Sequence, residues 1–238
     1  GFDVSKLEGG VWYREGEGFK NSGRFDNRRH SLDELPILDR ELTQWQLYAY
    51  DNGNFKYSPG AYTMAGRDCW YAKCTFCSWT TTYPKFNVRK PESVLDEIET
   101  LVGKYGVCEV FDDTGTFPAG NWLKRFCEGM IERGLHKKVV MGCNMRFDAL
   151  NLDQYRLMKK ANFRFLLFGL ESVNQETLDR LKKGDDRATM VRSCSDAAKA
   201  GLEPHLTVMF GYPWEDLRDI DRTVEFAQFL LRKGYAKT

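Results

Sequence analysis

The sequence predicts an α/β fold, a partial TIM-like (β/α) barrel with a short N-terminal connector segment. From about residue 61, strand patterns alternate with single helical patterns of ten to fifteen residues, which implies a parallel sheet with right-handed crossovers. Five βα units follow one another without the alternation typical of a doubly wound sheet. The segment "FRFLLFGL" is apolar throughout, as expected of a strand buried on both faces.

The first two units are defined by one helix each. "GAYTMAG" reads as the opening strand, and "PESVLDEIETLVGKYG" places five apolar residues on one helical face, with Pro91 near its start and Gly106 after its end. "VCEVF" is the second strand. "NWLKRFCEGMIERG" is the second helix, and Gly134 closes it.

Three further units complete the pattern. "KVVMGCNM" and "LDQYRLMKKAN" form the third strand and helix, and "FRFLLFGL" is followed by the helices "QETLDRLKKG" and "ATMVRSCSDAAKAG". "PHLTVMFG" and "LRDIDRTVEFAQFLLRKG" form the fifth unit. We expect a domain over residues 61–238.

Residues 1–60 have little sustained periodicity. "GGVWYREGEGF" reads as a strand and hairpin, and "RRHSLDELPILDREL" as an irregular connector. One hairpin cannot bury a core by itself, so this region is expected to be the tail of a preceding domain.

Composition excludes several classes of protein. The 238 residues carry 35 basic and 34 acidic side chains, a net charge of +1 that offers no field for nucleic acid or an anionic membrane. No apolar run is long enough to span a bilayer, and no signal-peptide pattern is present. Four of the seven cysteines are scattered singly within expected strands and helices, which indicates buried thiols in a reducing, cytoplasmic setting.

Polar and glycine-rich residues gather where the expected strands end. The first strand precedes a cysteine loop, and the others end in "FDDTGTF", "MRFD", "GLES" and "FGYPWED". Helix capping accounts for some of these residues. Because barrel enzymes place their sites at the carboxyl ends of the strands, the coincidence of five such ends favours a functional site there.

The loop "CWYAKCTFC" holds Cys69, Cys74 and Cys77 in C-x4-C-x2-C spacing. Structural zinc and most iron–sulfur clusters take four protein ligands, and the sequence has no second C-x2-C pair. Three thiolates on a four-iron cluster leave one iron open to a substrate or cofactor. Spacing alone favours such a cluster, with zinc or a redox pair as alternatives.

The chain resembles the radical S-adenosylmethionine (radical SAM) superfamily over residues 61–234. The resemblance rests on the cysteine loop, with Phe76 between its last two cysteines, and on three segments that follow it in order: "DDTGTF", "FGLESVNQETLDRLKKG" and "TVMFGYPWED". The loop has one residue more than the commonest C-x3-C-x2-C pattern.

The resemblance implies the cofactors and the site. Cys69, Cys74 and Cys77 would ligate a [4Fe-4S] cluster whose fourth iron binds S-adenosyl-L-methionine (SAM), with Phe76 beside it. It also implies the remaining SAM contacts: Asp112 or Asp113 to the ammonium, Arg146 to the carboxylate, and Glu171 and Ser172 to the ribose. For Arg146, an arginine on the surface rim is an equal alternative. Reductive cleavage of SAM would give a 5′-deoxyadenosyl radical that takes hydrogen from a substrate, a small molecule or a peptide, with an electron donor such as flavodoxin or ferredoxin.

The first sixty residues resemble the connector between the cobalamin-binding domain and the barrel of B12-dependent members. The resemblance therefore implies a preceding cobalamin domain, a sixth strand beyond residue 238, and cobalamin-dependent methyl transfer. No D-x-H-x-x-G segment, which supplies a cobalt ligand, occurs in the sequence. Oxidative cyclisation, rearrangement and methylthiolation are alternative reactions. A non-radical iron–sulfur enzyme and a zinc-stabilised binding module are alternatives of other classes.

Overall fold

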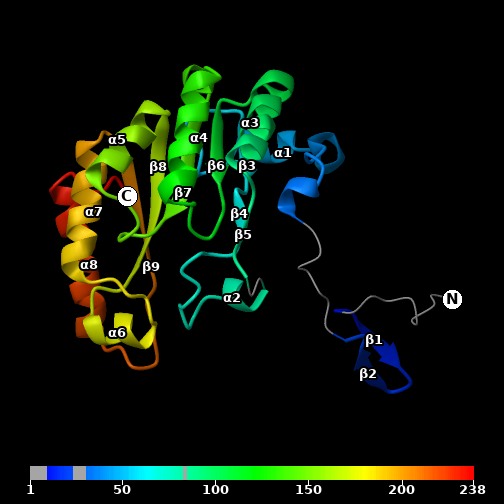
Figure 1. Cartoon of the computed structure of the whole chain (residues 1–238). Helices are drawn as coiled ribbons and strands as arrows, with labels where there is room; N and C mark the ends of the chain where they lie inside the picture. The colour runs from blue at the N-terminus through cyan, green and yellow to red at the C-terminus, as the bar shows by residue number, and fades with distance from the viewer. Residues whose placement is uncertain (1–9, 24–30, 83–84) are drawn as a thin grey trace. The chain divides into compact units, whose positions relative to one another are not determined.

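The computed structural model describes residues 10–23, 31–82 and 85–238. The chain divides into two compact units, residues 1–36 and 37–238 (Figure 1). The first unit contains the antiparallel hairpin of β1 (Trp12–Glu15) and β2 (Gly18–Asn21), followed by a 3-10 helix at Leu32–Glu34. The hairpin predicted for this region is confirmed. Residues 37–60 belong to the second unit, so the compact body starts before the expected boundary at residue 61.

The second unit is built on a parallel sheet. Among the described residues, five strands lie in the order β3-β6-β7-β8-β9 and all neighbours pair in parallel. The strands are β3 (Gly60–Thr63), β6 (Glu109–Asp112), β7 (Val140–Met145), β8 (Phe163–Glu171) and β9 (Glu203–Val208). Because chain order and sheet order coincide, this is the sheet of a partial TIM-like barrel, as the sequence predicts.

Helices follow the strands in the predicted places. They are α3 (Pro91–Tyr105), α4 (Gly120–Glu132), α5 (Leu152–Lys160), α6 (Gln175–Arg180), α7 (Arg187–Lys199) and α8 (Leu217–Arg232). Pro91 begins α3 and Gly106 ends it with φ of 65°, a left-handed conformation that suits glycine. The predicted helix "QETLDRLKKG" is shorter than expected, since Lys182 and Gly184 both have positive φ and turn the chain.

Short elements that periodicity did not reveal complete the unit. They are 3-10 helices at Arg40–Thr43 and Leu135–Lys137, α1 (Gln46–Ala49), β4 (Gly66–Arg67), α2 (Trp79–Thr82) and β5 (Asn87–Val88). At the free edge of β9, Lys237 and Thr238 each make one backbone hydrogen bond, to Pro204 and Leu206 respectively.

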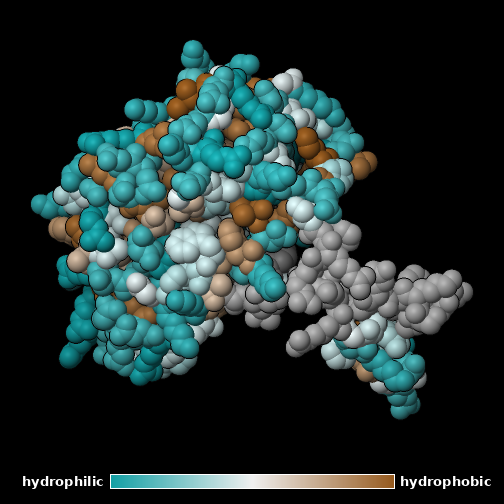
Figure 2. Space-filling model, viewed as in Figure 1, coloured by the Kyte–Doolittle hydropathy of each residue, from teal (hydrophilic) through white to brown (hydrophobic). Residues whose placement is uncertain are grey.

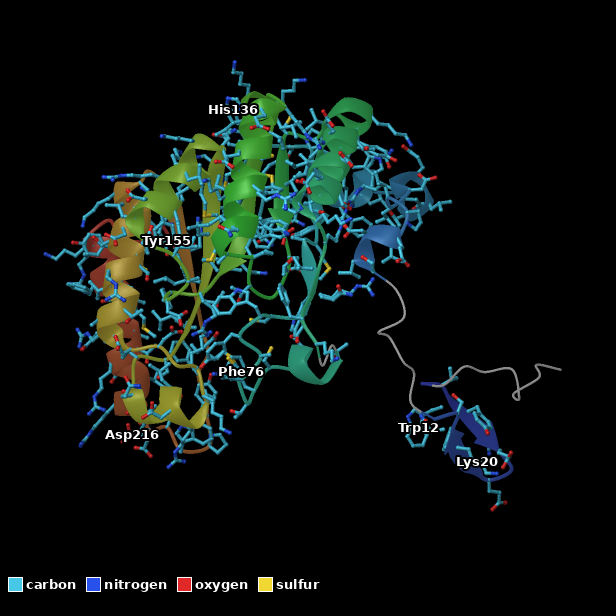
Figure 3. All side chains as sticks on the ribbon, viewed as in Figure 1. Trp12, Lys20, Phe76, His136, Tyr155 and Asp216 are labelled. Carbon is cyan, nitrogen blue, oxygen red and sulfur yellow. The ribbon has the colours of Figure 1, made fainter. Side chains whose placement is uncertain are left out.

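The apolar core lies between the sheet and its helices, and it includes Cys127, Cys143 and Cys194. Tyr155 of α5, labelled in Figure 3, is fully buried there. The outer face in Figure 2 is largely hydrophilic, with scattered apolar residues. No described helix has the length and apolar character that a membrane crossing requires.

An aromatic layer lines another part of the sheet. Tyr62, Phe111 and Phe165 are in aromatic contact, and the strand register joins them across β3, β6 and β8 through Gly142 of β7. A Cβ on Gly142 would lie 3.0 Å from Phe165 and 3.1 Å from Phe111, so the glycine makes room for both rings. His205 packs edge-on against Phe165, with the ring centroids 4.2 Å apart.

Candidate functional site

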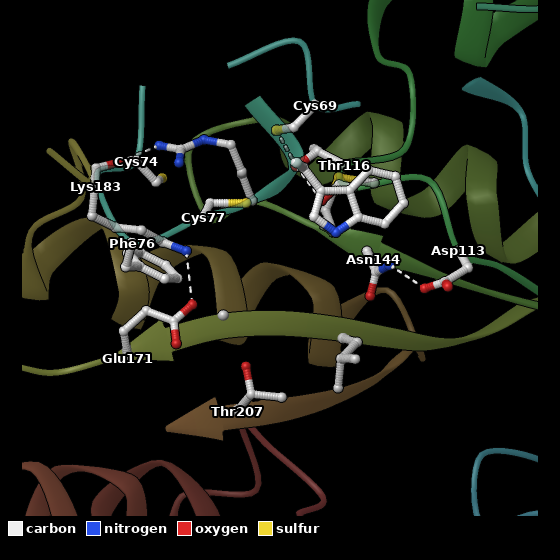
Figure 4. Close-up of a pocket in the computed structure, with 16 residues that line it drawn as sticks. Cys69, Cys74, Phe76, Cys77, Asp113, Thr116, Asn144, Glu171, Lys183 and Thr207 are labelled. Carbon is white, nitrogen blue, oxygen red and sulfur yellow. Dashed lines mark hydrogen bonds and ion pairs between the residues drawn. The ribbon is translucent and has the colours of Figure 1, made fainter. Parts of the chain in front are cut away.

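A pocket of about 240 Å³ lies at the carboxyl ends of the parallel strands (Figure 4). The pocket is lined by residues of the cysteine loop, of β7, β8 and β9, and of the loops after β6 and α6. The sequence predicts a functional site at this end of the sheet, and a pocket lies there.

The three loop cysteines line this pocket together. Cys69, Cys74 and Cys77 are partly exposed, and the Sγ of Cys69 lies 3.1 Å from Oγ1 of Thr116. Burial raises the pKa of the Cys74 thiol, while the cationic side chains of Lys183 and Arg146 act in the opposite direction. Such cations favour the thiolate, the form that binds metal.

A two-stranded clasp closes the base of the cysteine loop. β4 and β5 pair antiparallel, with Gly66 opposite Val88. A Cβ on Gly66 would lie 2.9 Å from the carbonyl oxygen of Asn87, so this close approach requires glycine. The amide of Gly66 also donates to Oγ1 of Thr114, which ties the clasp to the segment after β6.

A buried carboxylate anchors the clasp to the sheet. Oε2 of Glu97 in α3 accepts from Arg89 at 2.5 Å and from Thr63 at 3.0 Å, and Oε1 accepts from Arg40 at 2.9 Å. The amide of Arg89 donates to the carbonyl of Ala65 at 2.8 Å. Two arginines and a hydroxyl compensate the buried charge of Glu97 and fix both ends of the clasp.

Neighbouring aspartates at the end of β6 have different surroundings. Asp112 is fully buried and accepts from the amides of Ala65, at 2.7 Å, and Thr114, at 3.1 Å. Asp113 lines the pocket, and its Oδ1 accepts from Nδ2 of Asn144 at 3.1 Å. Asp112 therefore braces the loop from behind, and Asp113 lies on the pocket wall. Burial raises the pKa of Asp112 to about 7.

Glu171 and Lys183 form an ion pair on the pocket wall. Nζ of Lys183 lies 3.1 Å from Oε1 of Glu171, and both side chains are nearly buried (Figure 4). A register shift between Gly169 and Glu171, together with φ of 59° at Glu171, ends the strand irregularly. A Cβ on Gly169 would lie 2.4 Å from Oε1 of Glu171 and 2.9 Å from Nζ of Lys183, so the pair fills the space over this glycine.

Ser172 lies outside the pocket lining. Its hydroxyl is fully buried, donates to Oε1 of Glu215 at 3.2 Å and lies 3.4 Å from Oγ1 of Thr223. It therefore links the end of β8 to the segment after β9 and to α8. Its predicted contact with the SAM ribose stays a prediction.

Arg146 is a wall residue, and it is only 4% exposed. The sequence left a surface arginine and a ligand-facing one equally open, and this burial excludes the first. Its Nε donates to Asp148 at 2.9 Å, and its Nη2 lies 3.3 Å from Oδ1 of Asp185. Phe76 also lines the pocket and is 37% exposed; it lies on the cysteine loop in Figure 3.

Several wall residues were not predicted from the sequence. Lys183, Asn144, Thr116, Thr207 and Gly169 all line the pocket. The paired lysines of "KKG" after α6 were the available signal for Lys183, since a lysine buried beside a strand-end glutamate needs a partner.

The donor set suits an iron–sulfur cluster better than a single metal ion. Within the described ranges, no group of three His, Cys, Asp or Glu side chains converges as ligands of one ion. A tetrahedral zinc site requires such convergence on a single point. In a four-iron cluster each thiolate binds its own iron, so three thiols that line one pocket fit that group.

Comparison with known proteins agrees with the fold and the loop. A family profile described as "Radical SAM superfamily" matches residues 65–227. An uncharacterized methyltransferase of Pyrococcus horikoshii is 25% identical over 226 residues, which covers 90% of this chain and 47% of that protein. An anaerobic magnesium-protoporphyrin IX monomethyl ester cyclase of Cereibacter sphaeroides is 32% identical over 149 residues, 61% of this chain and 24% of that protein.

Among solved structures, the cobalamin-dependent S-adenosylmethionine radical enzyme OxsB with aqua-cobalamin bound superposes with a TM-score of 0.72. The match has 16% sequence identity and covers 91% of this chain and 32% of that one. The chain thus spans about half or less of the length of the proteins it matches. Because the family profile covers more than half of the sequence and includes the cysteine loop, the chain belongs to the radical SAM superfamily.

Proposed function

We propose that the chain is the barrel of a radical SAM enzyme in which Cys69, Cys74 and Cys77 hold a [4Fe-4S] cluster. The observation that carries this proposal is that all three thiols line one pocket at the strand ends. A cluster bound there would supply the electron that cleaves a C–S bond of the SAM sulfonium. The protein's part is to bind, orient and shield the reactants.

The wall residues support a division of binding roles. Asp113 is exposed to the pocket and can accept from the SAM ammonium, whereas Asp112 holds the loop from behind. Glu171 faces the pocket and can accept from the ribose hydroxyls, with Lys183 fixing its carboxylate. Ser172 positions this strand end through Glu215.

Arg146 lines the same pocket, and its guanidinium is the proposed partner of the SAM carboxylate. Phe76 lies between Cys74 and Cys77 and lines the pocket, and we propose that its ring limits the access of water to the cluster.

We propose cobalamin-dependent methyl transfer as the overall reaction. The methyltransferase name of the Pyrococcus horikoshii relative and the cobalamin-dependent title of OxsB support it, and each covers about nine tenths of this chain. In this proposal residues 1–60 connect the barrel to a cobalamin-binding domain in the intact protein. A flavodoxin or ferredoxin is the proposed electron donor, and the substrate is a small molecule or peptide.

Ring closure is the second candidate reaction. It is favoured by the magnesium-protoporphyrin monomethyl ester cyclase relative, which is more identical to this chain, 32%, over a shorter stretch. Both candidates share the cluster and the SAM-binding wall, and they differ in the fate of the substrate after hydrogen abstraction.

Product analysis tests the proposal. Anaerobically reconstituted protein, reduced in the presence of SAM, should release methionine and 5′-deoxyadenosine, and the Cys74→Ala variant should release neither. Release of S-adenosylhomocysteine that depends on added cobalamin would favour methyl transfer over ring closure. Protein that contains a full cluster but leaves SAM intact would contradict the proposed function.

A further inference from the structure

We propose that Tyr71 is a positioning residue that clamps the cysteine loop to the turn after α6 and so fixes Cys74 and the two pocket cations. This inference rests on the proposed function, because it concerns how the cluster ligands are held. Tyr71 lies between Cys69 and Cys74, in the stretch that is one residue longer than the commonest family spacing.

The hydroxyl of Tyr71 is seated on the turn itself. Its Oη donates to the carbonyl of Lys182 at 2.8 Å. A Cβ on Gly184 would lie 2.3 Å from the Oη of Tyr71, so the turn leaves room for the phenol only because residue 184 is glycine. Gly184 also has φ of 72°, in the left-handed region.

The ring of Tyr71 supports one of the cations. The guanidinium carbon of Arg146 lies 3.6 Å from the ring centroid, a close cation–π contact. Nη2 of the same guanidinium donates to the carbonyl of Lys183 at 2.9 Å and approaches Asp185. Tyr71, Arg146 and the turn at residues 182–185 therefore form a closed set of contacts.

A second attachment lies four residues further along the loop. The amide of Thr75 donates to the carbonyl of Leu181 at 3.0 Å, and its hydroxyl donates to the carbonyl of Arg180 at 3.1 Å. Cys74 is thus held between two anchors on the same turn, at Tyr71 and at Thr75.

The clamp connects the ligand loop to the SAM-binding wall. The turn that accepts from Tyr71 carries Lys183, whose Nζ pairs with Glu171. Loss of the clamp should therefore disturb both the loop that holds Cys74 and the positions of Arg146 and Lys183. A residue that only filled space would affect stability without changing how SAM meets the cluster.

The experiment compares Tyr71→Phe and Tyr71→Leu with Trp70→Leu, a change of the neighbouring ring, which meets Tyr71 edge-on at 6.4 Å, that leaves the Tyr71 bond to Lys182 in place. Tyr71→Phe keeps the ring beneath Arg146 and removes the bond to Lys182, and Tyr71→Leu removes both. Hydrogen exchange of the Thr75 amide in the metal-free protein is the first readout, because a broken clamp opens its bond to Leu181. We expect exchange to rise roughly tenfold in Tyr71→Leu, less in Tyr71→Phe, and little in Trp70→Leu.

The reconstituted protein gives the second readout. SAM should bind roughly tenfold more weakly to Tyr71→Leu, with a smaller SAM-induced change in the EPR signal per cluster, while Trp70→Leu should match the unchanged protein. Gly184→Ala should reproduce the defect from the other side of the contact, and a Tyr71→Phe background should lessen its effect by removing the clashing oxygen.

These outcomes separate the clamp from the proposed function. If the unchanged protein takes up no iron, the proposed function fails, yet hydrogen exchange in the metal-free variants still tests the clamp. Equal exchange at Thr75 and equal SAM affinity in Tyr71→Leu and Trp70→Leu would overturn the inference. If Tyr71→Leu does not fold, Tyr71→Phe and Gly184→Ala carry the test, and unchanged exchange in both would overturn it.

Discussion

Cysteines occupy two regions of this molecule with opposite surroundings. Cys69, Cys74 and Cys77 are partly exposed on the pocket wall, where Lys183 and Arg146 stand close to Cys74. Cys127 and Cys194 are packed in the core, where burial raises the pKa of each thiol to about 12. A thiol in the core is inert, whereas a thiol among cations on an accessible wall is available as a metal ligand.

Aspartates and glycines also form pairs with one member at the pocket wall and one away from it. Asp113 lines the pocket while Asp112 is buried behind it, and Gly169 lies under an ion pair while Gly103 of α3 has open space around its Cα. Residue type alone therefore does not predict a functional role. Each pair therefore allows a matched test of whether the residues on the pocket wall are the ones that bind iron or SAM.

The cysteines give the largest expected effect. Replacing Cys69, Cys74 or Cys77 by alanine should abolish iron uptake, because each removes one of three protein ligands. Cys194→Ala should leave iron content unchanged and cost about 1 kcal/mol of unfolding free energy. Iron and sulfide analysis after anaerobic reconstitution measures the first effect, and denaturant unfolding the second. Loss of iron in Cys194→Ala would break the contrast.

Gly169→Ala should give the next largest effect. The added methyl displaces the Glu171 carboxylate and the Lys183 ammonium, with which it would otherwise collide at 2.4 and 2.9 Å. SAM affinity should fall roughly 10- to 100-fold, as expected for loss of hydrogen bonds to charged groups, while iron content is retained. Calorimetric titration of the reconstituted protein with SAM measures the change.

Gly103→Ala is the control for this prediction. Gly103 is exposed within α3 and a Cβ there would meet nothing within 4 Å. The substitution should stabilise the protein by up to about 1 kcal/mol and leave SAM binding unchanged. Equal SAM affinity in Gly103→Ala and Gly169→Ala would show that the Glu171–Lys183 pair does not take part in binding.

The two aspartates should separate ligand binding from loop integrity. Asp113→Asn should weaken SAM binding roughly tenfold and leave iron content intact, since it removes one charge-assisted contact. Asp112→Asn should instead lower stability by about 1–3 kcal/mol, because its amide cannot accept from both Ala65 and Thr114. A fall in iron content in Asp113→Asn would assign that residue a structural role.

The raised pKa of Asp112 should make the stability of the protein depend on pH. Burial raises its folded-state pKa to about 7, above the unfolded value of about 3.9, so the folded protein binds the extra proton between these values. The stabilisation that protonated Asp112 gives is fully present below about pH 4 and is lost as the pH rises through 7. Over this range the free energy of unfolding falls by no more than about 1.4 kcal/mol per pH unit. Asp112→Asn should flatten the profile of unfolding free energy measured by urea between pH 5 and 8, and an unchanged slope would contradict this assignment.

The sheet and its helices could be predicted because their signals are local. Apolar periodicity, Pro91 and Gly106 identified α3, and the five strands were each marked by short apolar runs. The clasp of β4 and β5 could not be found this way. Each strand has two residues, too few for a periodic pattern, and their pairing joins segments on opposite sides of the cysteine loop.

The site was predicted less completely than the fold. The cysteine spacing identified the metal ligands to test, but choosing between Asp112 and Asp113 needed the register of β6 against its neighbours. Glu171 lines the pocket and Ser172 does not. The strand ends irregularly between them, with positive φ at Glu171, and this turn of the backbone could not be predicted from the sequence. Lys183 was missed because it comes from a turn that looked like a continuation of α6.

EPR spectroscopy of the reduced, reconstituted protein with and without SAM tests the central claim most directly. If Cys69, Cys74 and Cys77 hold a four-iron cluster with one iron free of protein ligands, saturating SAM should change the EPR signal, because the ligands of that iron change. The protein should contain about four irons per chain. Tight binding of one zinc without iron uptake, or a cluster whose signal is indifferent to SAM, would contradict the account.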